Sequence, residues 1–401
     1  MTQRAIIIGG SIGGLFAAAA LRARGWRVSV HERSDVPLAG RGAGIVTHDV
    51  LNAALAAVGA DLSNLGVAIT RRVTFDRDST PVRDLEMAQI VTSWDRVFQM
   101  LRQLMPDVDY VHGRQVTGYV QGPNAARVTF AEGPDAEADV IIGADGFRSA
   151  IRAQMQPWVQ PVYSGYVVWR AVADEAALDP ALCARFFDVF GFYLPRGMQV
   201  IGYPIAGAGN DLRPGHRRYN LVWYKPTDPV ELDDCLTDAE GRHHAISIPP
   251  PLVRPDVIDR VTRTAHDHLP AVFADVLRAA GRPFLAPIYD HLSDGFAQGR
   301  VALSGDAACV ARPHVGMGVT KAAQDALALA RHLDGARDIE AALAAYSAER
   351  VPAAQMAMTR SRRLGSYMLE GGQGTNPDGR SNPHLDEIMR LTAVADFSGG
   401  A

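Results

Sequence analysis

The six residues from Gly9 to Gly14, GGSIGG, have the composition and spacing of a turn that binds phosphate. They follow the β-type segment Ala5–Ile8 and precede the alanine-rich helical segment Leu15–Arg24. A dinucleotide pyrophosphate needs such a turn, because the backbone must approach the anion closely and a helix N-terminus must face it with free N–H groups. Ser11 replaces the second glycine of the G-x-G-x-x-G pattern, but it is small and its hydroxyl can contact phosphate.

An acidic residue stands where a nucleotide-binding βαβ unit requires one. Glu32 follows Gly14 by 18 residues and comes directly after a second β-type segment, Arg27–His31. At that place a carboxylate can accept hydrogen bonds from ribose hydroxyls. These residues predict nucleotide binding, with a glycine-rich tight turn as the alternative. By themselves they fit a nicotinamide dinucleotide and a flavin dinucleotide equally well.

Two later turns decide between those dinucleotides. Asp145 follows the apolar segment 138–142, and Asp306 follows the strand-like segment 300–304, with Gly316 and Gly318 just ahead of a helical segment. A carboxylate at a strand end can hold a polyol, and amides at a helix start stabilise negative charge on a bound ring. Either turn alone can be an ordinary surface turn. The three motifs in this order favour a flavin.

The region from Tyr163 to Tyr224 predicts a different kind of structure. Short aromatic and β-branched segments alternate there with glycine and proline turns, which is typical of an antiparallel sheet with one face available for a ligand. Side chains alternate between the two faces of a strand, so Tyr203 shares a face with Ile201, and Tyr224 shares a face with Val222. If these faces cover a flavin, the two tyrosines offer stacking and hydroxyl groups to an aromatic substrate, although tyrosines in sheets more often serve packing.

The composition limits the classes of partner. The chain has 401 residues, of which 47% are hydrophobic and 21% charged, which suits a globular protein with two domains or one large domain with an insertion. A net charge of −4 without a basic block favours neither nucleic acid nor a membrane as partner. The apolar stretch Ala5–Leu21 is interrupted by glycines, so a strand, turn and helix explain it better than a signal peptide does. The dispersed cysteines and histidines predict no disulfide, no metal site and a cytoplasmic location.

The three motifs resemble those of the single-component, group A, FAD-dependent aromatic hydroxylases, over roughly residues 5–367. Within that family the likeness is to the dihydroxypyridine hydroxylases, and it rests on four segments: GGSIGG at 9–14, GYVVWR at 165–170, GYPIAG at 202–207 and ARPHVGMGVTKAAQDA at 311–326. The resemblance implies a monooxygenase that hydroxylates an electron-rich aromatic or N-heteroaromatic ring, such as a hydroxypyridine. FAD would be the cofactor, NADH or NADPH and O2 the co-substrates, and the reaction would pass through a flavin C4a-hydroperoxide.

The resemblance also implies where the cofactor is held. Ser11 and Ile12 would contact the pyrophosphate, Glu32 and Arg33 the adenosine ribose, and Val116 the adenine. Further along, an aspartate would hold the ribityl chain, a proline would touch the flavin edge, and loop amides would face its pyrimidine carbonyl. The residues expected at FAD are Gly9, Ser11, Ile12, Gly14, Glu32, Arg33, Arg41, Val116, Asp145, Asp306, Pro313, Gly316, Met317 and Gly318.

Three positions depart from the pattern of the wider family. Cys309 stands where histidine is usual after Gly-Asp-Ala-Ala, and Thr320 stands where asparagine is common in the glycine loop. Trp94 occupies the place of an arginine that often contacts the flavin. The sequence offers three substitutes for that arginine: Arg41, Arg96 and Arg102.

The chemistry implied by the resemblance requires a base or a proton relay, because ring attack is fast only when the substrate hydroxyl is deprotonated or strongly hydrogen-bonded. His48 follows a segment that passes under the flavin in this family, and His314 lies beside the flavin edge; both can titrate near neutrality. We favour His48, because Pro313 fixes the backbone at His314 whereas His48 begins a turn and is freer to reach a substrate hydroxyl. A structural or surface histidine is the alternative for each.

Pattern and resemblance together predict an α/β fold: a Rossmann-type FAD-binding domain of the GR2-like kind, an inserted antiparallel β-sheet substrate domain and a helical C-terminal stretch. We expect residues 1–70, 95–162 and 285–355 to form the first domain, residues 71–94 and 163–284 the second, and residues 356–401 a C-terminal helix and a loosely ordered tail, which alternatively serves as a homodimer contact. No second Rossmann unit for NAD(P)H is expected. The alternative functions are a flavin oxidase, reductase or halogenase on the same fold, and a nucleotide-binding module without catalysis.

Overall fold

A six-stranded sheet carries the glycine-rich turn in the computed structural model, which describes residues 2–39, 43–368 and 385–395. The strand order is β16-β17-β10-β1-β2-β6, with β16 antiparallel at one edge and the others parallel. The strands are β1 (Arg4–Ile8), β2 (Arg27–His31), β6 (Tyr110–Val111), β10 (Val140–Gly143), β16 (Ala297–Gln298) and β17 (Val301–Leu303). The predicted α/β fold with a Rossmann-type unit is confirmed.

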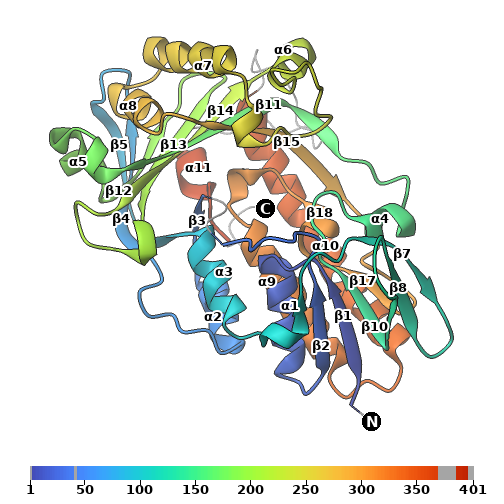
Figure 1. The fold of residues 1–401 in the computed structure, drawn as a ribbon. Coiled ribbons are helices and arrows are strands. Elements are labelled where there is room, and N and C mark those ends of the chain that lie inside the picture. The colour runs from blue at the N-terminus through green and yellow to red at the C-terminus, as the bar shows by residue number, and fades with distance from the viewer. Residues whose placement is uncertain (1, 40–42, 369–384, 396–401) are drawn as a thin grey trace.

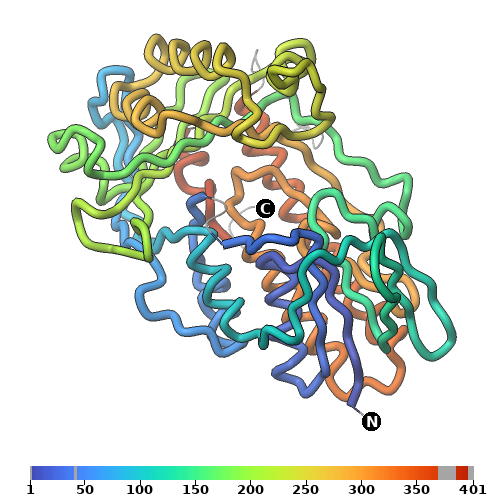
Figure 2. The backbone as a smooth tube through the Cα atoms, viewed as in Figure 1, coloured from blue at the N-terminus to red at the C-terminus, as the bar shows by residue number. Residues whose placement is uncertain are grey.

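This unit is assembled from segments far apart in the chain. Helix α1 (Ile12–Arg22) follows the glycine-rich turn and packs against α9 (Gly318–Leu333), which comes some 300 residues later. Figure 2 shows the orange part of the tube beside the dark blue part, where these two helices lie together. Late segments of the chain therefore complete the environment of an N-terminal motif.

A second, nine-stranded sheet lies beside this unit (Figure 1), in the order β18-β15-β11-β14-β13-β12-β4-β5-β3. Neighbouring strands are antiparallel except β12 and β4, which are parallel. The strands are β3 (Gly44–Val46), β4 (Val67–Phe75), β5 (Pro81–Ser93), β11 (Val162–Asp174), β12 (Val189–Tyr193), β13 (Gln199–Ile205), β14 (Arg218–Pro226), β15 (Phe284–Leu292) and β18 (Cys309–Val310). A small third sheet contains β7 (Val116–Gln121), β8 (Ala126–Phe130) and β9 (Ala136–Ala138).

The two faces of the large sheet have different roles. Trp169, Tyr219 and Trp223 point to a hydrophobic core under α7 (Pro255–His268) and α8 (Ala271–Ala279). Tyr203 and Tyr224 belong to a separate core on the opposite face, as the alternation predicted. That core also contains residues of α11 (Leu385–Leu391), which lies between the large sheet and the N-terminal unit in Figure 1.

The remaining helices surround these sheets. They are α2 (Asp49–Ala57), α3 (Trp94–Arg102), α4 (Ala150–Met155), α5 (Pro180–Phe186), α6 (Pro229–Cys235) and α10 (Ile339–Gly365). In the described ranges, no helix has both the length and the apolar character needed to span a bilayer.

Candidate functional site

The motif residues stand at the carboxyl ends of four neighbouring parallel strands. Glu32 follows β2, Gly9 follows β1, and Asp145 and Asp306 lie just beyond β10 and β17. The strand ends are level, because Ile8 pairs with both His31 and Gly143, and Gly143 pairs with Leu303. Adjacent strands are about 4.8 Å apart, so the four ends span roughly 14 Å. An elongated dinucleotide along this edge would meet Glu32, Gly9, Asp145 and Asp306 in that order.

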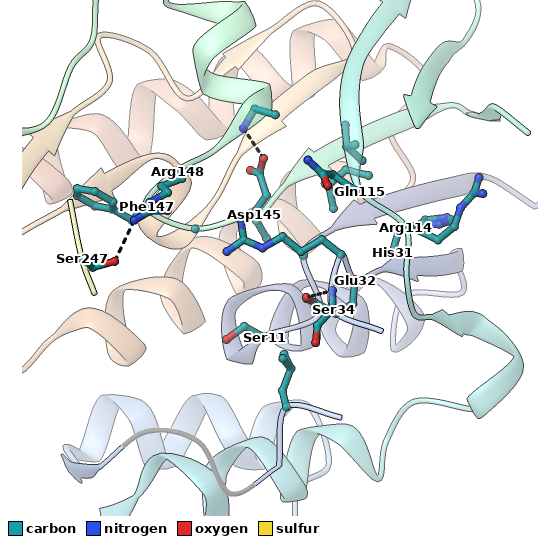
Figure 3. A pocket seen from close by; sticks show the side chains of 18 of the residues that line it. Ser11, His31, Glu32, Ser34, Arg114, Gln115, Asp145, Phe147, Arg148 and Ser247 are labelled. Atoms are coloured by element: carbon teal, nitrogen blue, oxygen red, sulfur yellow. Dashed lines mark hydrogen bonds between the residues drawn. The ribbon is translucent and has the colours of Figure 1, made fainter. Parts of the chain in front are cut away.

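A cavity of about 610 Å³, here called the nucleotide cavity, opens at the Glu32 end of this edge. Figure 3 shows Ser11, Glu32 and Asp145 around it, with Arg114 and Gln115 on one side. On the other side Arg148 donates a hydrogen bond of 2.9 Å to Ser247 Oγ (Figure 3). Six of the residues expected at FAD line this cavity: Gly9, Ser11, Glu32, Arg33, Val116 and Asp145.

The glycine turn tolerates no side chain at its decisive positions. Gly9 has φ of +102°, a backbone conformation that favours glycine. A Cβ atom on Gly14 would lie 1.9 Å from the carbonyl oxygen of Gly9. Glu32 holds the same turn, because its Oε2 accepts a hydrogen bond of 2.8 Å from Gly10 N and its Oε1 accepts one of 2.8 Å from Ser34 N. Each carboxylate oxygen keeps a lone pair for a ligand hydroxyl.

Asp145 combines a structural role with a free acceptor atom. Its Oδ2 accepts a hydrogen bond of 2.7 Å from Ala150 N at the start of α4. Its Oδ1 is buried and has no hydrogen-bond partner in the described part of the chain. Burial raises the pKa of this carboxyl. One oxygen is therefore available to a hydroxyl group in the nucleotide cavity.

A second cavity, of about 310 Å³ and here called the ring cavity, lies between the end of β17 and the inner face of the large sheet. Its wall is mostly apolar and includes Val168, Phe190, Ile201 and Val222. Seven of the sequence-predicted residues line it: Tyr203, Tyr224, Asp306, Pro313, Gly316, Met317 and Gly318. The two groups of predicted residues thus meet two cavities along one sheet edge.

The turn that presents Asp306 is held by buried charges that sequence reasoning missed. Lys321 Nζ donates to Gly305 O at 2.8 Å, and Asp325 Oδ2 accepts from Gly305 N at 3.0 Å. Arg350 Nε donates to the other oxygen of Asp325 at 2.8 Å. Asp306 itself is exposed and lines the ring cavity. Lys321 and Asp325 are four residues apart on an amphipathic helix, and this spacing is the feature of the sequence that could have predicted the ion pair.

His314 is enclosed and does not face the ring cavity. Its Nδ1 lies 2.8 Å from Gln199 Oε1 and its Nε2 lies 2.9 Å from the hydroxyl of Tyr166. Its ring also stacks on that of Tyr224, with 4.4 Å between ring centroids. Burial lowers the pKa of His314 to about 3. The imidazole is therefore neutral and has both nitrogens engaged, which favours the structural alternative.

His48 is likewise engaged at both nitrogens, so its side chain is not free in the way the sequence analysis expected. Its Nε2 donates to Ala393 O at 3.0 Å, which leaves Nδ1 to accept from Thr320 Oγ1 at 3.0 Å. The pKa of His48 is lowered, and burial of the imidazole is the main cause. The residue lines a separate cavity on the side of α2 and β5, away from Tyr203 and Tyr224.

The C-terminal segment 385–395 forms part of the ring cavity, which the sequence did not predict. Thr392 and Ala393 line the cavity, and Ala393 N donates to His314 O at 2.9 Å. The fully buried Arg72 holds this segment with hydrogen bonds of 2.6 Å to Met389 O and 2.7 Å to Thr392 O. Burial lowers the pKa of Arg72 to about 9. Both candidate histidines and a buried arginine thus converge on this segment.

The arginines proposed in place of a flavin-contacting arginine have other partners or lie outside the described residues. Arg96 Nη2 donates to Ser63 O, and Arg102 Nη2 donates to Asp107 Oδ1, each at 2.6 Å. Arg41 lies outside the described residues. Trp94 lines the nucleotide cavity, and the arginine that lines the ring cavity from the sheet is Arg170, which the sequence analysis did not select.

Comparisons with known proteins agree with this geometry. Residues 163–290 match the family described as FAD binding domain-like, and residues 259–361 match the family described as FAD binding domain. The chain is 31% identical over 373 residues to 2,6-dihydroxypyridine 3-monooxygenase of Paenarthrobacter nicotinovorans, covering 92% of this chain and 93% of the relative. It is 28% identical over 417 residues to 3-amino-4-hydroxybenzoate 2-monooxygenase of Streptomyces cremeus, covering 97% of this chain and 92% of the relative.

Solved structures give the same result. The structure of 2,6-dihydroxypyridine-3-hydroxylase from Arthrobacter nicotinovorans superposes with a TM-score of 0.87 at 30% identity, covering 96% of this chain and 98% of that one. The structure of Klebsiella pneumoniae HpxO complexed with FAD and uric acid shares the fold, with a TM-score of 0.76 at 22% identity. The match covers 97% of this chain and 93% of that one.

Proposed function

We propose a reaction for this chain, which belongs to the family of FAD-dependent aromatic-ring monooxygenases. The enzyme hydroxylates an aromatic or heteroaromatic ring, and the proposed substrate is a ring that already carries a hydroxyl group, in particular a hydroxypyridine. In the balanced reaction, ring C–H, O2, NAD(P)H and a proton give ring C–OH, water and NAD(P)⁺. The dihydroxypyridine relatives support the hydroxypyridine class.

The residues present fit FAD. The glycine turn has a fixed shape, because a Cβ on Gly14 would collide with the carbonyl of Gly9, and Asp145 offers a buried oxygen without a partner in the described part of the chain. Glu32 and Val116 would hold the adenosine, and Asp306 would hold the ribityl chain. The amides of residues 316–318 would face the pyrimidine ring at the start of α9. When bound, FAD supplies the redox chemistry that takes electrons from NAD(P)H and activates O2.

The ring cavity would orient the substrate and exclude water. Its apolar strand residues offer a dry surface to an aromatic ring, and Tyr203 and Tyr224 bring hydroxyl groups to it. Burial raises the pKa of Tyr203 to about 12, so this hydroxyl keeps its proton at neutral pH and acts as a donor. His48 would position the segment around Ala393 through its Nε2, whereas the His314 ring would position Gln199 and Tyr166.

The single observation that carries this proposal is the line of four motif residues that leads from the nucleotide cavity to a mostly apolar cavity. The test is to purify the protein, identify its flavin, and measure NAD(P)H oxidation and product mass with hydroxypyridines, phenols and hydroxybenzoates. We expect non-covalent FAD, stimulation of oxidation by a hydroxylated ring, and a product heavier by one oxygen atom. Oxidation without that mass gain for every compound would instead support a flavin oxidase or reductase.

A further inference from the structure

Two arginines line the ring cavity, and they differ in their partners. Arg312 Nε donates to Asp290 Oδ2 at 2.7 Å, so it has a buried carboxylate partner, which it shares with Arg362. Arg170 has no carboxylate partner among the described residues. Its hydrogen bond there runs from Nη2 to Gly44 O at 3.3 Å, and its Nε is buried without an acceptor. A guanidinium group has five donors, so most of the capacity of Arg170 is unused.

The strand directs this guanidinium to the cavity side of the sheet. Along β11, Val167, Trp169 and Ala171 belong to the outer core, whereas Val168 and Arg170 line the ring cavity. The cross-strand neighbours of Arg170 are Val222 on β14 and Phe284 on β15, both apolar, and the guanidinium lies 5.9 Å from the centroid of the Phe284 ring. A half-buried cation with apolar neighbours and few hydrogen bonds is unfavourable unless a ligand completes its shell.

Other unused donors lie close to Arg170. The hydroxyl of Tyr203 would be 2.8 Å from a Cβ built on Gly44, the residue whose carbonyl Arg170 contacts. Tyr224 lines the same cavity, and neither tyrosine hydroxyl has a hydrogen-bond partner within the described ranges. A cation and two neutral donors therefore face one small cavity. A complementary ligand carries acceptor oxygens, with its negative charge toward Arg170.

We propose that Arg170 binds the ionised hydroxyl of the substrate and so selects aromatic rings that carry an oxyanion. This inference rests on the proposed function and names the ionic form of its substrate. The hydroxyl proton goes to solvent before or during binding, because the guanidinium stabilises the anion in the cavity. The oxyanion donates electron density to the adjacent ring carbon, which is the condition for electrophilic attack. No side-chain base is then required, which agrees with the engaged nitrogens of His48 and His314.

The test measures ligand binding to the FAD-loaded protein through changes in flavin absorbance, without turnover. The probes are 2,6-dihydroxypyridine, which ionises, and 2,6-dimethoxypyridine, which cannot. We expect Arg170→Met to lower the affinity for the dihydroxy probe by about 10- to 100-fold and to leave the affinity for the dimethoxy probe unchanged. Arg170→Lys should restore part of the selectivity. Arg218→Met is the matched control, because Arg218 belongs to the same sheet but donates to Ala206 O away from the cavity.

The ligand spectrum provides a second readout. With the wild-type protein, the bound dihydroxy probe should show the absorbance of its anion at a pH below its solution pKa, and Arg170→Met should abolish this shift. The inference would be overturned if Arg170→Met lost affinity for both probes equally, or if it lost FAD without a change in probe selectivity. If the wild-type protein binds the anion through Arg170 but yields no oxygenated product, the proposed function fails and the binding site stands.

Discussion

The nucleotide cavity and the ring cavity are built in different ways. The motif residues of the nucleotide cavity follow β1, β2 and β10; Gly14 is confined by Gly9 of the same βαβ unit, and Gly9 is confined by Ala144 at the end of the neighbouring strand β10. The ring cavity draws its wall from six strands (β3, β11, β12, β13, β14 and β15), from Asp306 and residues 310–319, and from the C-terminal residues Thr392 and Ala393. The nucleotide cavity is thus marked by short motifs at strand ends, whereas the wall of the ring cavity depends on the pairing of many strands.

This difference has an energetic consequence. A substitution in the glycine turn removes the binding surface directly, because backbone atoms there have no room to move. A substitution at the ring cavity acts through side chains and through the docked C-terminal segment, which can adjust. Effects should therefore decrease from the glycine turn to the outer supports of the ring cavity.

The largest effect is expected for Gly14→Val. The new Cβ would overlap the carbonyl oxygen of Gly9 at 1.9 Å, so the phosphate turn must distort. The Kd for FAD should rise by at least about 1,000-fold, measured as flavin bound per protein. Gly13→Ala is the control, because its Cβ would meet only Ala322 Cβ, at an ordinary contact of 3.5 Å. Equal FAD content in both variants would contradict the role of the turn.

A smaller but clear loss is expected for Asp306→Ala. The substitution removes the carboxylate proposed to hold the ribityl chain while leaving the supports of the turn, Lys321 and Asp325, in place. Losing hydrogen bonds to a charged group should weaken FAD binding by about 10- to 150-fold. The affinity for FAD is measured by flavin fluorescence titration, and Asp306→Asn should recover part of it. Unchanged binding would place the ribityl chain elsewhere.

Arg72→Met should affect the ring cavity more than the cofactor. It removes the donors to Met389 O and Thr392 O and so loosens the wall formed by Thr392 and Ala393. We expect a loss of about 1–3 kcal/mol in the free energy of unfolding and a KM for the aromatic substrate raised by about tenfold, with FAD content retained.

Arg71→Met is the control for that experiment. Arg71 is the adjacent residue on β4, but its side chain is 51% exposed and pairs with Asp84 at the surface. Surface pairs of this kind contribute little to stability. If Arg71→Met and Arg72→Met behave alike, the C-terminal segment does not depend on the buried guanidinium.

The same comparison explains what the sequence could predict. The glycine turn, Glu32, Asp145 and Asp306 could be placed at strand ends from the sequence, because each belongs to a short local pattern. The faces of Tyr203 and Tyr224 followed from alternation along single strands. Arg170 and the docking of Ala393 could not be found in this way, since both depend on which strands become neighbours and on contacts between residues more than 100 positions apart.

The smallest effect is expected for His48→Gln. Loss of a general base typically lowers turnover by about 10²- to 10⁴-fold, but His48 donates from Nε2 to Ala393 O, and a glutamine amide can replace that bond. Turnover should therefore fall by less than about tenfold, with FAD affinity unchanged. Because burial lowers the pKa of His48 below its ordinary value of 6.5, the unfolded state binds the proton more strongly than the folded state. The wild-type protein should then lose stability as the pH falls below about 6.5, and His48→Gln should reduce that loss, whereas the exposed His266→Gln should not. A fall in turnover of about 100-fold or more, together with a flattened acidic limb of the pH profile and intact thermal stability, would restore His48 as the proton acceptor.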